Sequence, residues 1–155
     1  LWEGLRDGTL SVVVSDHSPC TPSLKHLDRG DFLAAWGGIA SLQLGLSALW
    51  TQAAPRGFRI EDVFRWSALG TATLVGLADR KGSIEPGKDA DLVVWDDDAP
   101  LAVTPELIRH RHKTTPYSGR TLRGVVRRTI LRGRTIFEDG RIVGAPSGRL
   151  LTRQQ

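Results

Sequence analysis

The stretch Leu10–Cys20, L-S-V-V-V-S-D-H-S-P-C, contains the pattern that decides the fold. Its first five residues, Leu10–Val14, are mostly apolar and β-branched, the composition of a short strand buried on both faces, as in a parallel sheet. Four polar residues follow at once, and Pro19 prevents the strand from continuing. We therefore predict polar side chains at the carboxyl end of a buried strand, where α/β sheets and barrels bind ligands and carry out chemistry.

The roles of Asp16 and Ser18 have two interpretations at this point. Asp and Ser often cap the segment that follows a strand, and the alternative is a catalytic or metal-binding role. A serine hydrolase is excluded, because adjacent residues on a strand point to opposite faces and the chain has no G-x-S-x-G motif. The pattern at 15–18 alone leaves the first two interpretations open.

Length and composition indicate a globular protein of one medium domain or two small ones. The chain has 155 residues, of which 40% are hydrophobic and 25% charged. It has no Met and begins at Leu1, so we expect a piece of a longer chain. The single Cys20 excludes an internal disulfide framework and favours a reducing cytoplasmic location.

The charge pattern and the hydropathy argue against two classes of partner. The net charge is +4, but most basic residues are spread among acidic ones, and no aromatic-studded basic stripe accompanies them. We therefore expect no nucleic-acid partner. No apolar run approaches the 18 or more residues of a membrane span, and we expect no membrane partner.

The first half of the chain continues with helical patterns. Apolar spacing predicts an amphipathic helix from about Ile39 to Trp50, directly after Gly37-Gly38. The glycine pair is either a tight turn or a close backbone approach to a ligand, with free N–H groups at the helix start. The stretch Ile60–Leu77 predicts one or two helices, with Gly70 as the break.

The second half changes composition at Gly82. A Pro-Gly turn precedes a predicted strand at Asp91–Trp95, and we expect the acidic run Asp96–Asp98 to be a solvated turn rather than a metal site. Thr104–Arg111 predicts a short helix with Thr as its N-cap. Two histidines lie i, i+2 among cations at 109–113, which argues against a metal site there.

The clearest β pattern is Thr121–Val143, with a strong hairpin turn at Asp139-Gly140. With the strand before it, this makes three or four short strands. That number is too small for an independent sandwich, so we expect further strands from outside this chain.

Taken together, these motifs resemble the C-terminal third of the cyclic amidohydrolases, the group of allantoinases, hydantoinases (dihydropyrimidinases) and dihydroorotases. V-S-D-H-S-P at 14–19 resembles the end of the eighth barrel strand. The runs at 81–95 and 118–133 resemble the re-entry into, and the closing hairpin of, the family's small β-sandwich. The resemblance implies an α/β fold: residues 1–80 would end a TIM-type (β/α)8 barrel, and 81–155 would form part of a β-sandwich. Within the latter, the helix and loop at 104–124 would pack back on the barrel.

The resemblance also implies a dinuclear mechanism, with two divalent metal ions, commonly zinc, and a bridging hydroxide. By resemblance, Asp16 is a metal ligand and the catalytic general base. Ser18 and Gly37 would bind the substrate, and His17 would orient its metal-binding neighbour. Enzymes of this kind act on small cyclic amides, and the parent protein would be a homotetramer.

Within the group, three segments resemble allantoinases more than hydantoinases. These are S-D-H-S-P-C-T-P from residue 15, A-W-G-G-I-A-S-L-Q from residue 35 and R-H-K-T-T-P-Y-S-G-R-T from residue 111. The implied activity is hydrolysis of allantoin to allantoate in purine catabolism. Three alternatives stay open: a hydantoinase, a non-catalytic dihydropyrimidinase-like protein, and an independent interaction module at 82–155.

The sequence departs from the family pattern in its metal ligands. The family's H-x-H pair, its bridging Lys and two further His residues belong to earlier barrel strands, and this chain has four His in all, with no H-x-H on a predicted strand. We therefore predict that the chain by itself neither holds the dinuclear centre nor turns over substrate. It would need the missing N-terminal barrel portion as its partner.

Overall fold

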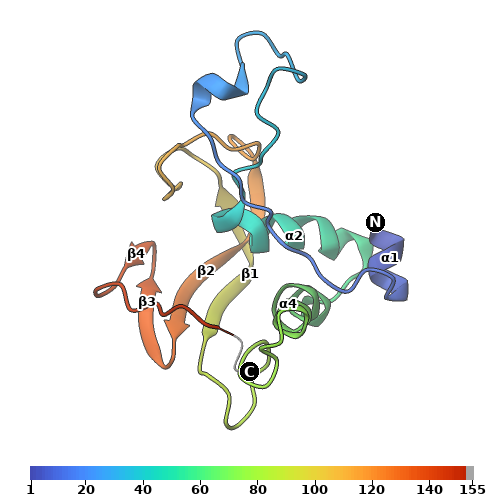
Figure 1. The fold of residues 1–155 in the computed structure, drawn as a ribbon, viewed down its shortest axis with the longest axis vertical. Coiled ribbons are helices and arrows are strands. Elements are labelled where there is room, and N and C mark those ends of the chain that lie inside the picture. The colour runs from blue at the N-terminus through green and yellow to red at the C-terminus, as the bar shows by residue number, and fades with distance from the viewer. Residues whose placement is uncertain (153–155) are drawn as a thin grey trace.

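The computed structural model describes residues 1–152, which form a helical part and a four-stranded antiparallel sheet (Figure 1). The helical elements are α1 (Trp2–Asp7), η1 (Pro22–Lys25), η2 (Leu42–Leu44), α2 (Gly45–Ala53), η3 (Ala54–Arg56), α3 (Ile60–Phe64), the π-helical turn η4 (Arg65–Leu69) and α4 (Gly70–Leu74). The strands are β1 (Leu92–Ala102), β2 (Thr121–Leu131), β3 (Arg134–Glu138) and β4 (Arg141–Ile142), in the order β1-β2-β3-β4. None of the described helices is long and apolar enough to cross a membrane.

The helical part is built around one aromatic core. Apolar residues of α1, α2 and the 58–66 region bury their side chains together, and Trp95 of β1 packs against them. The buried members are Leu5, Trp50, Ala53, Phe58, Val63 and Trp66. Phe58 and Trp66 meet edge to face with ring centroids 5.0 Å apart, a favoured aromatic geometry.

The predicted break at Gly70 is wrong, because the helix runs on from α3 through η4 into α4. Gly70 has helical dihedral angles, and a Cβ there would lie 2.5 Å from the Ser11 carbonyl oxygen. The glycine therefore allows the helix to approach the extended segment 10–14 closely. The predicted helix from Ile39 begins later, at Leu42, and continues as α2 to Ala53.

The predicted strand at Leu10–Val14 does not form within the described residues, and as part of a barrel it stays a prediction. The segment is extended and crosses the helical part between α1 and the projecting loop at 19–38 (Figure 1), but it has no pairing strand. A parallel β-bridge joins His17 to Ile39 just beyond this segment. A strand requires a neighbour for its N–H and C=O groups, and without one Val14 is 65% exposed.

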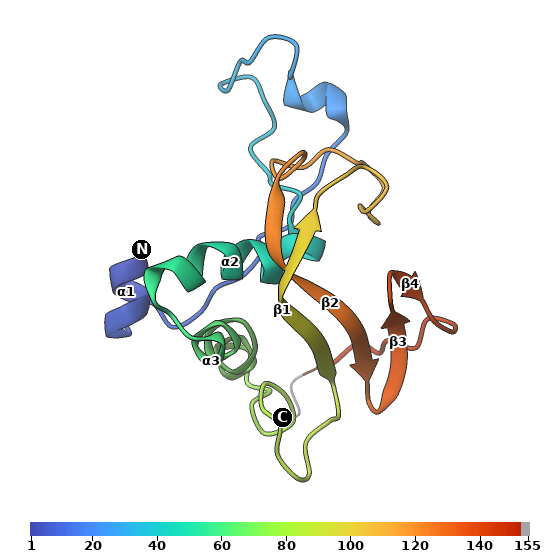
Figure 2. The ribbon, with the colours of Figure 1, turned by 180° about the vertical axis from the view of Figure 1, so that it is seen from behind.

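The sheet confirms the predicted β region, including the turn at Asp139-Gly140, and Figure 2 shows β1 and β2 as long bent strands. The prediction of a solvated turn at Asp96–Asp98 is wrong, because β1 continues through it to Ala102. The register with β2 shifts between Asp96 and Pro100, and this bulge accommodates the acidic run. The carboxylates of Asp96 and Asp98 pair with arginines of β2 rather than with water alone.

The predicted helix at Thr104–Arg111 forms only turns. Side chains bind the Leu107 carbonyl, which a helix over 104–111 would use internally, and the Ile108 carbonyl at its C-terminal end. The Leu107 carbonyl accepts a hydrogen bond from Gln43 Nε2 at 2.7 Å, and the Ile108 carbonyl accepts one from Lys113 Nζ. These bonds and the short length of the segment explain why no helix forms.

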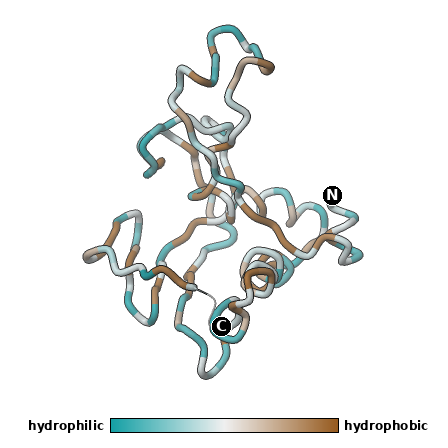
Figure 3. Tube along the Cα trace, in the orientation of Figure 1, coloured by the Kyte–Doolittle hydropathy of each residue, from teal (hydrophilic) through white to brown (hydrophobic). Residues whose placement is uncertain are grey.

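A second apolar cluster joins the two halves of the chain. It consists of Leu44, Val103, Ile108 and Leu122, all buried. The buried Ser47 hydroxyl of α2 also donates to the Gly124 carbonyl of β2 at 2.7 Å. The hydropathy trace alternates between apolar and polar residues along the helices and strands, and the loop between α4 and β1 is mostly polar (Figure 3). The division into domains at residue 80 stays a prediction.

Candidate functional site

Asp16 lies where the extended segment turns towards the projecting loop. Its φ is +45°, a left-handed conformation that Asp tolerates better than most non-glycine residues. The side chain is exposed, and within residues 1–152 its carboxylate has no hydrogen-bond or ion-pair partner. A carboxylate held by the backbone but without a partner can bind a cation or accept a proton from a ligand.

His17 anchors this turn to the start of the next helical element. Its Nδ1 accepts hydrogen bonds from the backbone N–H groups of Ser41 and Leu42, each at 3.1 Å. Because Nδ1 is an acceptor, the ring hydrogen lies on Nε2. The Ser41 hydroxyl adds a bond to the Ser15 carbonyl at 2.5 Å. His17 therefore fixes the backbone directly beside Asp16.

Ser18 lies against the Gly37-Gly38 pair. A Cβ at Gly38 would collide with the Ser18 carbonyl and would lie 2.5 Å from its hydroxyl oxygen, so this position requires glycine. Gly37, in contrast, has open space where a Cβ would be. Within the described residues, neither the Ser18 hydroxyl nor the Gly37 backbone has a hydrogen-bond partner, so both are available to a ligand.

The glycine pair does not lie at the helix start, which corrects one sequence-based expectation. The first helical turn begins at Leu42, and the N–H groups of Ser41 and Leu42 are bound by His17 rather than free. Gly37 instead lines a cavity of about 650 Å³ between the projecting loop and the segment 113–118. The polar groups open to a ligand are therefore those of the loop itself.

Residues 38–42 each have a backbone group bound to another part of the chain. The partners are Lys25 Nζ for the Gly38 carbonyl, Ser18 N–H for the Ile39 carbonyl, Thr115 Oγ1 for the Ala40 carbonyl, and His17 Nδ1 for the N–H groups of Ser41 and Leu42. These bonds hold residues 38–42 in place next to His17 and Ser18.

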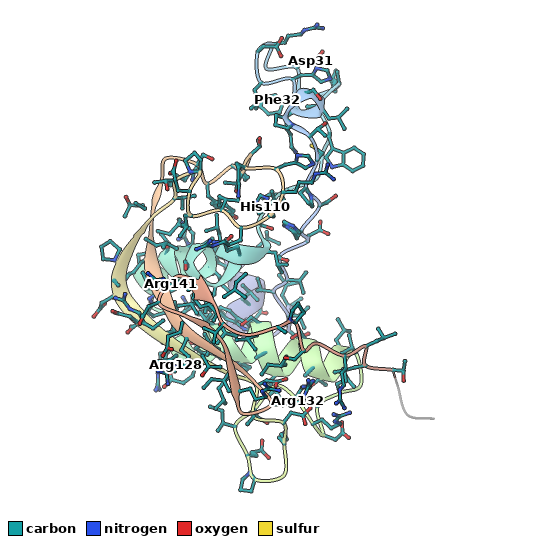
Figure 4. The ribbon with its side chains drawn as sticks, turned by 90° about the vertical axis from the view of Figure 1, so that its left-hand side faces the viewer. Asp31, Phe32, His110, Arg128, Arg132 and Arg141 are labelled. Atoms are coloured by element: carbon teal, nitrogen blue, oxygen red, sulfur yellow. The ribbon has the colours of Figure 1, made fainter. Side chains whose placement is uncertain are left out.

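His110 brings a second imidazole to the site. Its ring meets that of His17 edge to face, with centroids 5.4 Å apart, and its Nδ1 is buried. Figure 4 shows His110 below the projecting loop, whose tip carries Asp31 and Phe32. Burial of the ring lowers the pKa of His110, and the nearby His17 adds to the effect. A neutral His110 can pack closely against His17.

Sequence reasoning missed three contributors to this site. Lys25, His110 and Thr115 gave no local signal, since their roles depend on contacts made across long stretches of chain. Thr115 and its partner Ala40, for example, are 75 residues apart. The sequence marks Gly38 as part of a glycine pair, but its contact with Ser18 depends on the fold and not on spacing.

The described residues do not form a complete metal site. Within residues 1–152 no group of three or more His, Cys, Asp or Glu side chains is placed to hold a metal ion. The free carboxylate of Asp16 fits the role of a single ligand, and its immediate neighbour His17 uses Nδ1 for the backbone. A dinuclear centre would therefore need ligands from outside these residues.

Comparison with known proteins adds the decisive observation. The model of the amidohydrolase family matches residues 1–136, most of the chain. The chain belongs to the amidohydrolase family. Its relatives in this family include the allantoinase of Streptomyces avermitilis, 51% identical over 99% of this chain and 34% of that protein. The allantoinase of Saccharomyces cerevisiae is 44% identical over 97% of this chain and 32% of that protein.

Solved structures of amidohydrolases share the fold described above. The L-hydantoinase (dihydropyrimidinase) of Arthrobacter aurescens superposes with a TM-score of 0.85 and 28% identity, covering 92% of this chain and 32% of that protein. The chain thus spans about a third of the length of the relatives it matches. The fold is that of the corresponding part of these proteins.

Proposed function

We propose that this chain is the C-terminal portion of an allantoinase, which hydrolyses the cyclic amide of allantoin to allantoate. The observation that carries the proposal is the exposed Asp16 carboxylate, which has no partner among the described residues and lies two residues before a Ser18 hydroxyl packed against Gly38, on a chain 51% identical to an allantoinase. The lower identity to the hydantoinase structure, 28%, favours allantoin over the hydantoinase substrates.

Asp16 is the proposed catalytic residue and metal ligand. When bound, two divalent ions, which we propose to be zinc, would supply an activated hydroxide and polarise the ring amide. Asp16 would take the hydroxide proton and deliver it to the leaving ring nitrogen, since its carboxylate has no competing partner. His17 would keep Asp16 in place through its two bonds to the backbone of 41–42.

Ser18 and Gly37 are the proposed substrate contacts. A cyclic ureide presents alternating N–H donors and carbonyl acceptors along its ring edge. The Gly37 backbone offers one donor and one acceptor, and the Ser18 hydroxyl can act as either. These neutral groups match an uncharged ring, and the open space at Gly37 allows the ring to approach the backbone.

The wider architecture follows from the same proposal. Residues 1–80 would close a TIM-type barrel in which the segment 10–14 is the last strand, and 81–155 would belong to a β-sandwich. The barrel strands outside this chain would pair with 10–14 and supply the missing metal ligands. We further propose that the parent protein is a cytoplasmic homotetramer that acts in purine catabolism.

Steady-state hydrolysis by the complete protein tests the proposal. Allantoin, hydantoin and dihydrouracil would be compared at equal enzyme concentration, before and after removal of metal by a chelator. We expect metal-dependent hydrolysis with the highest kcat/KM for allantoin. A preference for hydantoin or dihydrouracil would establish the hydantoinase alternative, and no hydrolysis of any of the three would favour a non-catalytic protein.

A further inference from the structure

The segment 37–42 is held from two sides of the molecule. Three of its four partners, His17, Ser18 and Lys25, come from the preceding 30 residues of chain. The fourth, Thr115, comes from beyond β1 and donates to the Ala40 carbonyl at 2.6 Å. Thr115 therefore connects the second half of the chain to the proposed substrate contact at Gly37.

The bond between Thr115 and Ala40 is shielded from water. Thr115 is 6% exposed and Ala40 is 4% exposed. A hydrogen bond in such surroundings is stronger than one at the surface, and an unpaired buried carbonyl is correspondingly costly. If the Thr115 hydroxyl is removed, water does not take its place at the Ala40 carbonyl. The segment 37–42 is therefore released.

Gln43 adds a second attachment at the end of the same segment. Its Nε2 donates to the Leu107 carbonyl, and its Oε1 accepts from the Arg109 N–H, both at 2.7 Å. Both the Nε2 and the Oε1 atom of the Gln43 amide are therefore hydrogen-bonded to the backbone of the 104–120 region. The attachments at Ala40 and Gln43 lie on either side of the two bonds that His17 makes to Ser41 and Leu42.

The 104–120 region also lines the cavity of about 650 Å³ that Gly37 lines. Lys113, Thr114, Thr115 and Pro116 line it together with Gly37 and Gly38. Gly37 directly precedes three held residues, because the carbonyls of Gly38, Ile39 and Ala40 accept from Lys25, Ser18 and Thr115. The stretch that follows Gly37 is therefore held by contacts from both halves of the chain.

We propose that Thr115, assisted by Gln43, is a positioning residue that holds the 37–42 segment where Gly37 can bind the substrate. This inference rests on the proposed function. Thr115 does not act on the reacting atoms, so its loss weakens substrate binding and leaves the chemical step nearly unchanged. The second half of the chain thereby contributes to substrate affinity.

The test uses the complete protein with Thr115→Val, which preserves shape and removes the hydroxyl, and Thr115→Ser, which restores it. We expect Thr115→Val to raise KM roughly 5- to 30-fold, the cost of an unmade buried hydrogen bond, with kcat within about threefold. Thr115→Ser should return KM close to that of the unsubstituted protein. Gln43→Met, at an exposed position, should raise KM more modestly and provides a variant with little risk of misfolding.

The matched control is Ser47→Ala. The Ser47 hydroxyl is also buried, and it also connects the two halves of the chain by donating to the Gly124 carbonyl. Within the described residues it has no hydrogen bond to the segment 37–42. We expect it to lower Tm without changing KM. If Thr115→Val and Gln43→Met change Tm alone, like Ser47→Ala, the positioning role is wrong.

Amide hydrogen exchange separates this inference from the proposed function. Thr115→Val should accelerate exchange of the amides at 39–42, and Ser47→Ala should not. If the unsubstituted protein hydrolyses no cyclic ureide, the proposed function fails, and the exchange data still decide whether Thr115 holds the segment. Unchanged exchange at 39–42 would overturn the inference even in an active enzyme.

Discussion

At the scale of single residues, the proposed chemistry depends on one carboxylate that has no partner among the described residues. Asp16 is exposed, has a left-handed backbone and pairs with no other described residue. Asp139, at the tip of the β3-β4 hairpin, has a similar φ of +42° and is also exposed. Both residues are exposed aspartates with a left-handed backbone, but only Asp16 belongs to the proposed site. Asp139 is therefore a matched control.

We therefore expect Asp16→Asn to lower kcat/KM for allantoin roughly 10²- to 10⁴-fold in the complete protein, the usual range for loss of a general base. Asn tolerates the left-handed backbone, so thermal stability should change little. Asp139→Asn should leave both activity and stability unchanged. Full activity of the Asp16 variant would contradict the proposed role.

His110 gives a pH dependence at the same scale. Burial lowers its pKa below the ordinary value, so the unfolded chain binds a proton at a higher pH than the folded one. His110 is therefore neutral in the folded protein at neutral pH, and its stabilising effect is lost as pH falls below about 6.5.

Chemical denaturation between pH 5 and 8 measures this effect. We expect the free energy of unfolding to decrease below about pH 6.5 and His110→Gln to flatten the decrease. His26→Asn is a suitable control, because His26 has a φ of +46°, which Asn accepts, and lies outside the His17–His110 contact. An equal flattening by both variants would show that the effect is not specific to His110.

At the scale of elements, two helical glycines allow the effect of helix propensity on stability to be distinguished from the effect of packing. Gly45 begins α2, and a Cβ added there would lie at an ordinary contact distance, 3.8 Å, from Ser15 Cβ. Gly70 begins α4, and a Cβ added there would lie 2.5 Å from the Ser11 carbonyl oxygen. Alanine is favoured over glycine in helices by about 1 kcal/mol, but a clash with backbone can outweigh this.

We expect Gly45→Ala to raise the free energy of unfolding by up to about 1 kcal/mol, and Gly70→Ala to lower it by about 1–3 kcal/mol. Denaturant unfolding of the two variants of the complete protein checks both signs. A stabilising Gly70→Ala would mean that segment 10–14 does not lie against α4.

At the scale of the whole molecule, the described residues lack part of what the proposed site requires. Within the described residues no cluster could hold a metal ion, and the extended segment 10–14 has no strand beside it. Apolar side chains that a neighbour would cover are exposed, including Val14 at 65% and Leu74 at 64%. Such surfaces promote association of the isolated chain.

We therefore expect residues 1–155, produced alone, to bind no stoichiometric pair of divalent ions and to hydrolyse no allantoin. Metal analysis after dialysis and a hydrolysis assay check this, with the complete protein as the positive control. Hydrolysis by the isolated chain would show that the ligands lie within it and that the proposed mechanism is wrong.

The local pattern of the sequence determined the β-hairpin at Asp139-Gly140, the helical spacing after residue 42, the acid at residue 16 and the family resemblance. These depend on turn chemistry, on side-chain periodicity and on motifs that adjacent residues carry. Only the tertiary structure decided that Asp96–Asp98 lie in a bulged strand, that 104–111 forms no helix, that His110 contacts His17, and that Thr115 binds Ala40. Each of these depends on a partner far away in the chain, because hydrogen bonds and burial between distant residues override local preference. The strand expected at 10–14 shows the same rule, since extended residues become a strand only when another strand lies beside them.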